Sequence, residues 1–279
     1  MRSDGERVAV ITGGASGLGR ALALALGQQA WTVVVTDIDE GGARDTLDAL
    51  RGRGGEGISR ALDVRDPEAF EALAEEVFGR WGRLDLLINN AGVAATGEVG
   101  KVSLEDWRWC LDIDLYGPIH GCHAFAPRMR AQGFGQIVNI ASIAGFALGA
   151  RMGPYNVAKA GVVALSETLR AELLGTGVGV TVVCPGFFAT NIARNMRVTS
   201  DREREKTVAL IEGSGLGADQ VAARILAAAR RNTPILVLPF DALVIFWLRR
   251  LFPARATEIM REMIARRAPR GPAAPRDAR

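Results

Sequence analysis

The stretch that decides the fold lies near the N-terminus and reads Val8-Ala9-Val10-Ile11-Thr12-Gly13-Gly14-Ala15-Ser16-Gly17-Leu18-Gly19. The apolar run predicts a buried strand, the glycines that follow predict a tight turn, and residues 17–29 predict a helix. Glycine spacing alone would also fit a turn without a ligand. A strand before the turn and a helix after it favour a pyrophosphate site, because backbone N–H groups at a helix N-terminus bind such anions.

Further along the chain, apolar runs alternate with helical segments. The strand candidates after the first are 32–36, 57–62, 84–88, 135–140, 178–184 and 235–238. Continuous apolar strands are typical of a parallel sheet that is covered on both faces. The sequence therefore predicts an α/β fold, a single doubly wound Rossmann-type domain with about seven parallel strands flanked by helices.

We predict three segments from this pattern. Residues 1–239 form the Rossmann-type domain, with a substrate lid at about 187–215. Residues 240–267 form a C-terminal extension of an apolar helix and a basic one, and the Arg- and Pro-rich residues 268–279 form a disordered tail.

Charge is unevenly distributed along the 279 residues. The net charge is +3, but residues 249–279 hold nine Arg against three acidic residues, a net of +6, which leaves −3 for residues 1–248. A basic face for nucleic acid on the body of the protein is therefore not indicated. The Arg tail alone, without interleaved aromatics or a known motif, is a weak indication of nucleic-acid binding.

The cysteines indicate the redox environment of the protein and whether it binds a metal ion. They are odd in number and lie among apolar residues, at Cys110, Cys122 and Cys184. This argues against a disulfide framework and for a reducing cytoplasm, and no Cys/His spacing suggests a metal site. The N-terminus shows no apolar signal segment. We therefore expect a cytoplasmic protein without a metal ion.

Asp37 closes the second predicted strand and indicates the cofactor type. An acidic residue at this place can accept hydrogen bonds from an adenosine ribose and would repel a 2′-phosphate, so Asp37 favours NAD over NADP. Arg44 nearby could instead accommodate a 2′-phosphate. Asp37 could also be an ordinary surface or helix-capping residue, because Asp39 and Glu40 follow it.

Tyr155 and Lys159 lie one helical turn apart, so both side chains can face the same cleft. A neighbouring ammonium and an oxidised nicotinamide would lower the pKa of the phenol and let Tyr155 exchange a proton with an alcohol or carbonyl. Ser142 follows the 135–140 strand and could hold the substrate oxygen. Each has an ordinary alternative: a half-exposed helix face for the pair, and a turn or helix cap for Ser142.

Taken together, these residues resemble the short-chain dehydrogenase/reductase family in its single-domain form, over residues 7 to about 240. The motifs that match in order are T-G-x-x-x-G-x-G at 12–19, the acidic Asp37, Leu62-Asp63-Val64, Asn89-Asn90-Ala91-Gly92, Ser142 with Y-x-x-x-K, and P-G-x-x-x-T at 185–190. The cofactor contacts that the resemblance implies are Gly13, Ser16, Gly17, Leu18, Gly19, Asp37, Ile38, Asp63, Val64, Asn90, Ala91, Gly92, Tyr155, Lys159, Pro185, Gly186, Phe188 and Thr190.

The resemblance implies a reaction. Hydride would pass between a nicotinamide and the carbon of a ketone or secondary alcohol, while Tyr155 transfers the proton, Ser142 orients the substrate oxygen, and Lys159 also binds the nicotinamide ribose. The sequence departs from the family at Asp114, where Asn often holds a water of a proton relay. We keep Asp114 as a candidate relay residue whose negative charge would tend to keep Lys159 protonated.

The expected substrate walls are residues 93–100, 143–152 and 187–215. They contain the largely apolar set Val93, Phe146, Leu148, Met152, Phe187, Phe188 and Met196. This favours a bulky, uncharged, hydrophobic substrate, although the same side chains could simply pack against one another. Two other functions remain open: an NADP-dependent carbonyl reductase, and a non-catalytic dinucleotide-binding sensor or scaffold.

The C-terminal extension is unusual for this fold. Residues 240–252 predict an apolar helix and 254–267 a basic amphipathic one, both too short to span a bilayer. The extension could cover the substrate pocket, bury against a second subunit, or lie on an anionic membrane surface as a peripheral contact. The family resemblance implies a homodimer or homotetramer formed through helices at about 103–131 and 154–175.

Overall fold

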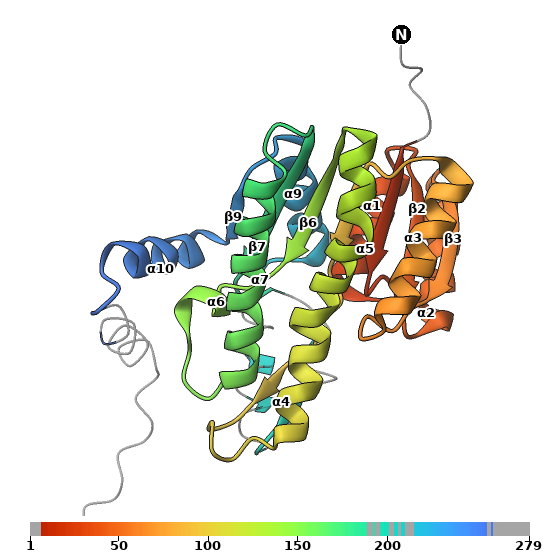
Figure 1. Cartoon of the computed structure of the whole chain (residues 1–279). Helices are drawn as coiled ribbons and strands as arrows, with labels where there is room; N and C mark the ends of the chain where they lie inside the picture. Colours follow the sequence, from red (N-terminus) through yellow and green to blue (C-terminus); the bar gives the residue numbers. More distant parts are fainter. Residues whose placement is uncertain are drawn as a thin grey trace, which may run out of the picture.

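A parallel sheet is the centre of the protein, which is described from a computed structural model (Figure 1). The structure describes residues 7–188, 192, 196–200, 204–205, 208–209, 215–255 and 258. Within these residues, seven parallel strands lie in the order β3-β2-β1-β4-β6-β7-β9. They are β1 (Val8–Thr12), β2 (Thr32–Asp37), β3 (Glu56–Ala61), β4 (Leu86–Asn89), β6 (Gly135–Ile140), β7 (Val178–Pro185) and β9 (Ile235–Leu238). The predicted doubly wound Rossmann-type fold is confirmed.

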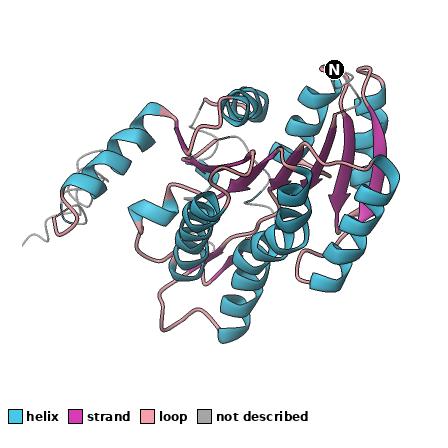
Figure 2. Ribbon diagram, turned by 45° about the horizontal axis from the view of Figure 1, so that its top comes forward, coloured by secondary structure: helices cyan, strands magenta, loops and turns pink. Residues whose placement is uncertain are grey.

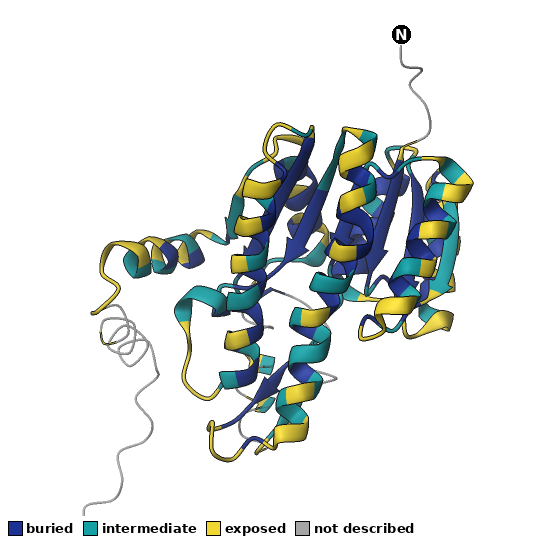
Figure 3. Ribbon diagram, viewed as in Figure 1, coloured by how far each residue is buried: buried dark blue, intermediate teal, exposed yellow. Residues whose placement is uncertain are grey.

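Helices cover both faces of this sheet (Figure 2). One face carries α1 (Gly17–Gly27), α2 (Glu40–Arg51) and α9 (Ala218–Arg230), and the other carries α3 (Pro67–Trp81), α5 (Gly117–Gln132) and α7 (Gly153–Glu172). Alternate residues of β1 face opposite ways: Ile11 joins the cluster with α1, and Val10 joins the cluster with Phe70 of α3. Figure 3 shows the inner strands, such as β1, β4 and β7, as buried, as both-sided covering requires, whereas the edge strands β3 and β9 are mostly half-buried.

The strand order reverses between β1 and β4. The chain moves outward from β1 to β3 and then crosses to β4, which pairs with the other side of β1. In open parallel sheets, ligands bind outside the carboxyl ends of the strands at such a reversal. The glycine-rich turn after β1 and the residues after β4 both lie at this point.

Local sequence signals set the helix ends. Asp66 caps α3 by accepting hydrogen bonds from the N–H groups of Glu68 and Ala69, and Pro67 occupies the first helical turn. The helix ends at Gly82, whose φ of +67° is the left-handed conformation that glycine adopts at little cost. Capped ends of this kind make helix positions readable from sequence.

The segment predicted as one helix over 103–131 is divided in the structure. It consists of α4 (Leu104–Leu111), a π-helical turn at Asp112–Tyr116 and α5. A π turn inserts one extra residue into the helical repeat, so it shifts which side chains face the sheet. This turn carries Asp114 into the interior.

The remaining described elements are short. They are β5 (Ala95–Thr96), which pairs in parallel with β8 (Arg197–Val198), α6 (Ala144–Ala147) and α10 (Phe240–Leu251). The helix α10 agrees with the prediction for 240–252, whereas the predicted tail at 268–279 and most of 254–267 lie outside the described residues. Among the described helices, none is long and apolar enough to cross a membrane.

Candidate active site

The glycine-rich turn forms a close-fitting cradle between β1 and α1. Gly13 and Gly17 have φ angles of +67° and +52°, the left-handed region that favours glycine. A Cβ on Gly13 would lie 2.8 Å from the Ala91 Cα, and a Cβ on Gly19 would collide with the Gly13 carbonyl oxygen. The Ser16 side chain makes no capping hydrogen bond to α1. The first-turn N–H groups, including those of Leu18 and Gly19, therefore suit an anion such as a pyrophosphate.

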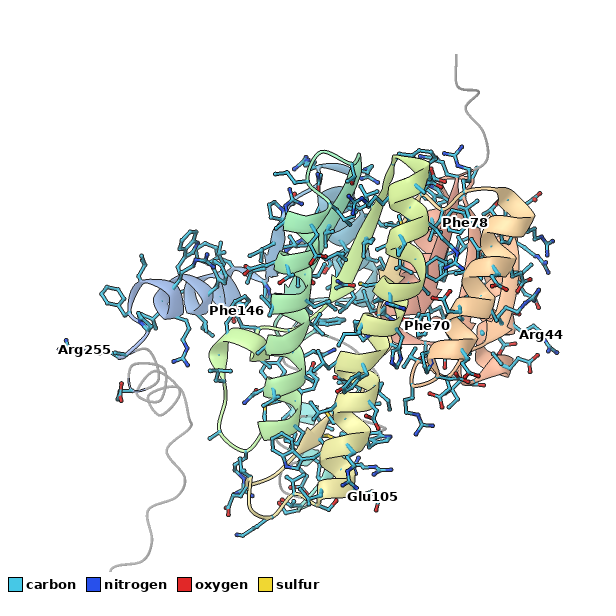
Figure 4. All side chains as sticks on the ribbon, in the orientation of Figure 1. Arg44, Phe70, Phe78, Glu105, Phe146 and Arg255 are labelled. Carbon is cyan, nitrogen blue, oxygen red and sulfur yellow. The ribbon has the colours of Figure 1, made fainter. Side chains whose placement is uncertain are left out.

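Asp37 is tied to this turn. Its Oδ2 accepts a hydrogen bond from the Ala15 N–H at 2.9 Å, and its Oδ1 accepts one from the Asp39 N–H at 3.0 Å. The half-buried carboxylate therefore stands at the end of β2 beside the cradle, next to the exposed Ile38. Arg44 lies at the outer surface of α2 and pairs with Glu40 at 2.8 Å (Figure 4).

A network led by Thr12 joins the turn to the end of β4. The Thr12 Oγ1 accepts hydrogen bonds from the N–H groups of Asn90 and Ala91, each at 3.0 Å. The Asn90 Nδ2 donates back to the Thr12 and Gly13 carbonyl oxygens. Thr12 is absent from the predicted contact set, although the same motif contains it. Its role here is to hold the two strand ends together.

Asp63 and Val64 follow β3, which pairs with β2. The Arg65 guanidinium donates to both carboxylate oxygens of Asp63, and this pairing holds the pKa of Asp63 below its ordinary value. The Val64 carbonyl oxygen lies 3.0 Å from a His120 ring nitrogen. Both residues are thus fixed by contacts within the protein.

Ser142 and Tyr155 meet at the carboxyl end of the sheet. Ser142 follows β6, where its Oγ accepts a hydrogen bond from the Ala144 N–H at 3.1 Å and donates to the Pro185 carbonyl oxygen at 3.4 Å. Tyr155 lies in the first turn of α7, and the nearby Ser142 side chain lowers the pKa of its phenol. The two hydroxyls that the sequence predicts to act on one substrate oxygen therefore lie together.

Lys159 lies one turn further along α7 and points into the same interior space. Its Nζ lies 3.2 Å from the Ile140 carbonyl oxygen and 5.6 Å from the centre of the Tyr155 ring. Gly92 closes this space, because a Cβ there would lie 3.4 Å from the Lys159 Nζ. The structure therefore brings Ser142, Tyr155 and Lys159 into one cluster with the N-N-A-G segment.

Asp114 lies against Lys159, fully buried in the π-helical turn. Its Oδ1 accepts a hydrogen bond from the Val93 N–H at 2.7 Å, and its Oδ2 lies 3.3 Å from the Lys159 Nζ. That distance makes an ion pair. Among the described residues, Oδ2 has no hydrogen-bond partner. The sequence does not reveal the contact to Val93, since a backbone donor leaves no mark on residue type.

The charges of this cluster act on one another. Burial raises the pKa of Tyr155 above its ordinary value, Lys159 opposes that rise, and Asp114 adds to it. Although burial alone would lower the pKa of Lys159, the neighbouring Asp114 and Tyr155 raise it above its ordinary value. Burial likewise raises the pKa of Asp114. Tyr155, Lys159 and Asp114 therefore each keep a proton to higher pH than the same group would in water.

The P-G-x-x-x-T segment begins at the end of β7. The Pro185 carbonyl oxygen accepts the Ile143 N–H, and the Gly186 N–H donates to the Leu238 carbonyl oxygen. Phe188 packs in the hydrophobic cluster of the α1 face. Thr190 lies outside the described residues. Pro185 and Gly186 thus link the Ser142 loop to the end of β9.

The predicted substrate walls divide into two groups. Leu148 and Phe187 are each 42% exposed. Phe146 instead packs edge-on against Phe246 of α10 with ring centres 4.9 Å apart, and Met196 is buried. The three cysteines are buried and free, and no group of His, Cys, Asp or Glu side chains within the described residues could hold a metal ion.

The chain is similar to known proteins in both sequence and structure. Residues 7–201 match the family model for short chain dehydrogenases. A crystal structure of a short-chain dehydrogenase/reductase from Burkholderia phymatum, in complex with NAD, superposes with a TM-score of 0.84 at 32% identity and covers 98% of this chain and 100% of that one.

Two relatives from Mycobacterium tuberculosis are similar in sequence. The oxidoreductase SadH is 38% identical over 211 residues, which cover 75% of this chain and 76% of that protein. The oxidoreductase EphD is 34% identical over 258 residues, which cover 89% of this chain but only 44% of that protein. The chain thus spans less than half the length of EphD.

Proposed function

This chain belongs to the short-chain dehydrogenase family, and we propose that it is an oxidoreductase that acts on CH–OH or C=O groups with Ser142, Tyr155 and Lys159 as its catalytic set. The observation that supports this most directly is the position of the Lys159 Nζ, 5.6 Å from the centre of the Tyr155 ring, with Ser142 also acting on the phenol to lower its pKa. A phenol and a hydroxyl that lie this close can both contact a single substrate oxygen.

Each side chain has a distinct task in this proposal. Tyr155 donates its proton to a carbonyl oxygen during reduction and accepts the proton of an alcohol during oxidation. Ser142, held by the Pro185 carbonyl oxygen and the Ala144 N–H, orients that oxygen. Lys159 favours the phenolate by its charge, and Asp114 holds the ammonium in place across 3.3 Å.

The cofactor that we propose is NAD, which supplies or accepts the hydride when bound. The turn suits a pyrophosphate because a Cβ on Gly13 or Gly19 would collide with the Ala91 or Gly13 backbone, so glycine alone permits a turn this tight at the N-terminus of α1. Asp37, fixed beside the cradle by the Ala15 N–H, would accept hydrogen bonds from the adenosine ribose and repel a 2′-phosphate. Arg44, which would serve NADP, instead pairs with Glu40 at the surface.

The substrate that we propose is a bulky, hydrophobic ketone or secondary alcohol. Leu148 and Phe187 offer exposed apolar surface near the Ser142 loop, while Phe146 and Met196 are already occupied by packing. Fewer of the apolar residues that the sequence placed around the substrate are therefore free to contact it. Turnover of hydrophobic ketones compared with small hydroxy acids tests it, and a preference for the acids would contradict an apolar pocket.

Replacement of Tyr155 by Phe tests the catalytic set. We expect Tyr155→Phe to reduce turnover of a responsive ketone by roughly 100-fold or more, because general acid–base catalysis is lost. Binding of NADH, followed by its fluorescence, should persist. The matched control is Tyr116→Phe, since Tyr116 is the other tyrosine of the chain and is 50% exposed. Equal activity of the two variants would reject the proposal.

A further inference from the structure

The helix α10 carries an exposed apolar stripe. Its inner side is buried at Ala242 and at Phe246, which packs on Phe146. Its outer side has large apolar residues spaced by four, three and four positions, and Phe252 follows the helix end. The exposed fractions are 78% for Phe240, 43% for Val244, 51% for Trp247, 66% for Leu251 and 54% for Phe252. These five residues are called the α10 stripe.

The α10 stripe is a group of neighbouring apolar residues, in contrast to apolar residues that are exposed singly on a protein surface. Figure 1 shows α10 projecting from the sheet domain, and Figure 3 shows exposed residues along it. At their exposed fractions the five side chains offer roughly 500–600 Å² of apolar surface. Apolar patches of this size on a monomer are commonly functional.

The charge next to the stripe indicates which partner suits it. Arg249 and Arg250 end α10, and Arg255 follows. They begin the segment 249–279, with nine Arg against three acidic residues, while residues 1–248 carry a net charge of −3. An anionic surface would therefore attract this end of the molecule and repel the rest, which turns the stripe towards that surface.

We propose that the α10 stripe, with the basic residues beside it, docks on an anionic lipid surface. Aromatic and aliphatic side chains beside Arg are typical of helices that lie in the membrane interface. The twelve residues of α10 extend only about 18 Å, against a hydrocarbon core of about 30 Å, so the helix lies along the surface.

A second copy of the chain fits the stripe less well. Pairing of two stripes would bring together two segments that each carry a net charge of +6. The stripe contains none of the residues proposed for proton transfer or cofactor binding, so this inference is independent of the proposed function.

Flotation of the full chain with vesicles tests the inference. We expect it to float with phosphatidylcholine vesicles that contain phosphatidylglycerol at low salt, and to do so much less with pure phosphatidylcholine or at high salt. The variant F240S/W247S/L251S should reduce the bound fraction to roughly a tenth or less. The matched control V99S/L104S/L174S removes three apolar residues that are 69%, 73% and 85% exposed elsewhere, and should float like the unaltered chain.

Tryptophan fluorescence separates a specific contact of the stripe from general adhesion. Anionic vesicles should shift the emission to shorter wavelength in the unaltered chain but not in Trp247→Phe. Absence of flotation at low salt, or equal loss in both triple variants, would overturn the inference. So would a change in oligomeric state of F240S/W247S/L251S in sedimentation with vesicle binding retained, which would assign the stripe to a second copy. Circular dichroism establishes that each variant is folded.

Discussion

Asp114 is the residue whose charge sets the proposed site apart. Its carboxylate adds to the rise of the Tyr155 pKa, which Lys159 opposes. In alcohol oxidation Tyr155 must lose its proton, so kcat/KM rises as pH passes its pKa. Asp114→Asn removes the negative charge and lowers that pKa, so we expect the rising limb to move to lower pH.

The pH profile of kcat/KM with a fixed alcohol measures this shift. The amide oxygen of Asn can still accept the Val93 N–H, so the turn is preserved. Asp112→Asn, in the same π-helical turn but only half-buried, is the matched control and should leave the profile in place. An unshifted profile for Asp114→Asn would mean that Asp114 influences neither Tyr155 nor a proton relay.

Asp37 bears on cofactor choice. Its loss removes the hydrogen bonds that the charged carboxylate would accept from the ribose, each worth about 1.5–3 kcal/mol. It also removes the electrostatic repulsion of a 2′-phosphate. We therefore expect Asp37→Ala to lower the ratio of kcat/KM with NAD to that with NADP by roughly 10- to 100-fold. Asp45→Ala, which removes an exposed carboxylate from α2, should leave the ratio unchanged. A similar ratio in both variants would remove Asp37 from the proposed specificity.

At the scale of elements, Gly121 lets α5 lie close to β4. A Cβ on Gly121 would collide with the Asn89 side-chain oxygen. The Asn89 Nδ2 in turn donates a hydrogen bond to the Asn139 Oδ1 of β6 at 2.8 Å. We expect Gly121→Ala to lower the free energy of unfolding by about 1–3 kcal/mol. Gly79→Ala on α3, with open space around it, should be neutral or stabilise by up to about 1 kcal/mol. Denaturant unfolding measures both, and equal effects would contradict the close contact.

The elements also differ in how far the sequence determines them. The strands were predictable because parallel strands buried on both faces are continuous apolar runs, as in β1 and β2. The motifs that converge on the sheet edge were predictable because strand ends meet there. The π turn and the β5–β8 pair were not, since one extra residue in a helix and two-residue strands leave no periodic pattern. The Thr12 and Val93 contacts depend on backbone groups that every residue carries.

For the whole molecule, the hydrophobic clusters of the sheet use residues up to Leu238, and α10 adds Phe246 against Phe146. We propose on this basis that the chain divides near residue 239 into a sheet domain and an extension. A chain ending at Arg255 should then keep the melting temperature of the full chain to within about 2 °C, since it keeps every one of these contacts.

A chain ending at Pro239 should behave differently, because it uncovers Phe146 and the Gly186 loop, which Ala242 closely approaches. Loss of one buried phenylalanine costs about 3–5 kcal/mol, so we expect a melting temperature roughly 5–15 °C lower. NADH binding should persist in both chains, because the glycine-rich turn follows β1, which is separated from β9 in the sheet by β4, β6 and β7. If the chain ending at Arg255 lost as much stability as the shorter one, residues beyond 255 would belong to the folded unit, and the boundary near 239 would have to be abandoned.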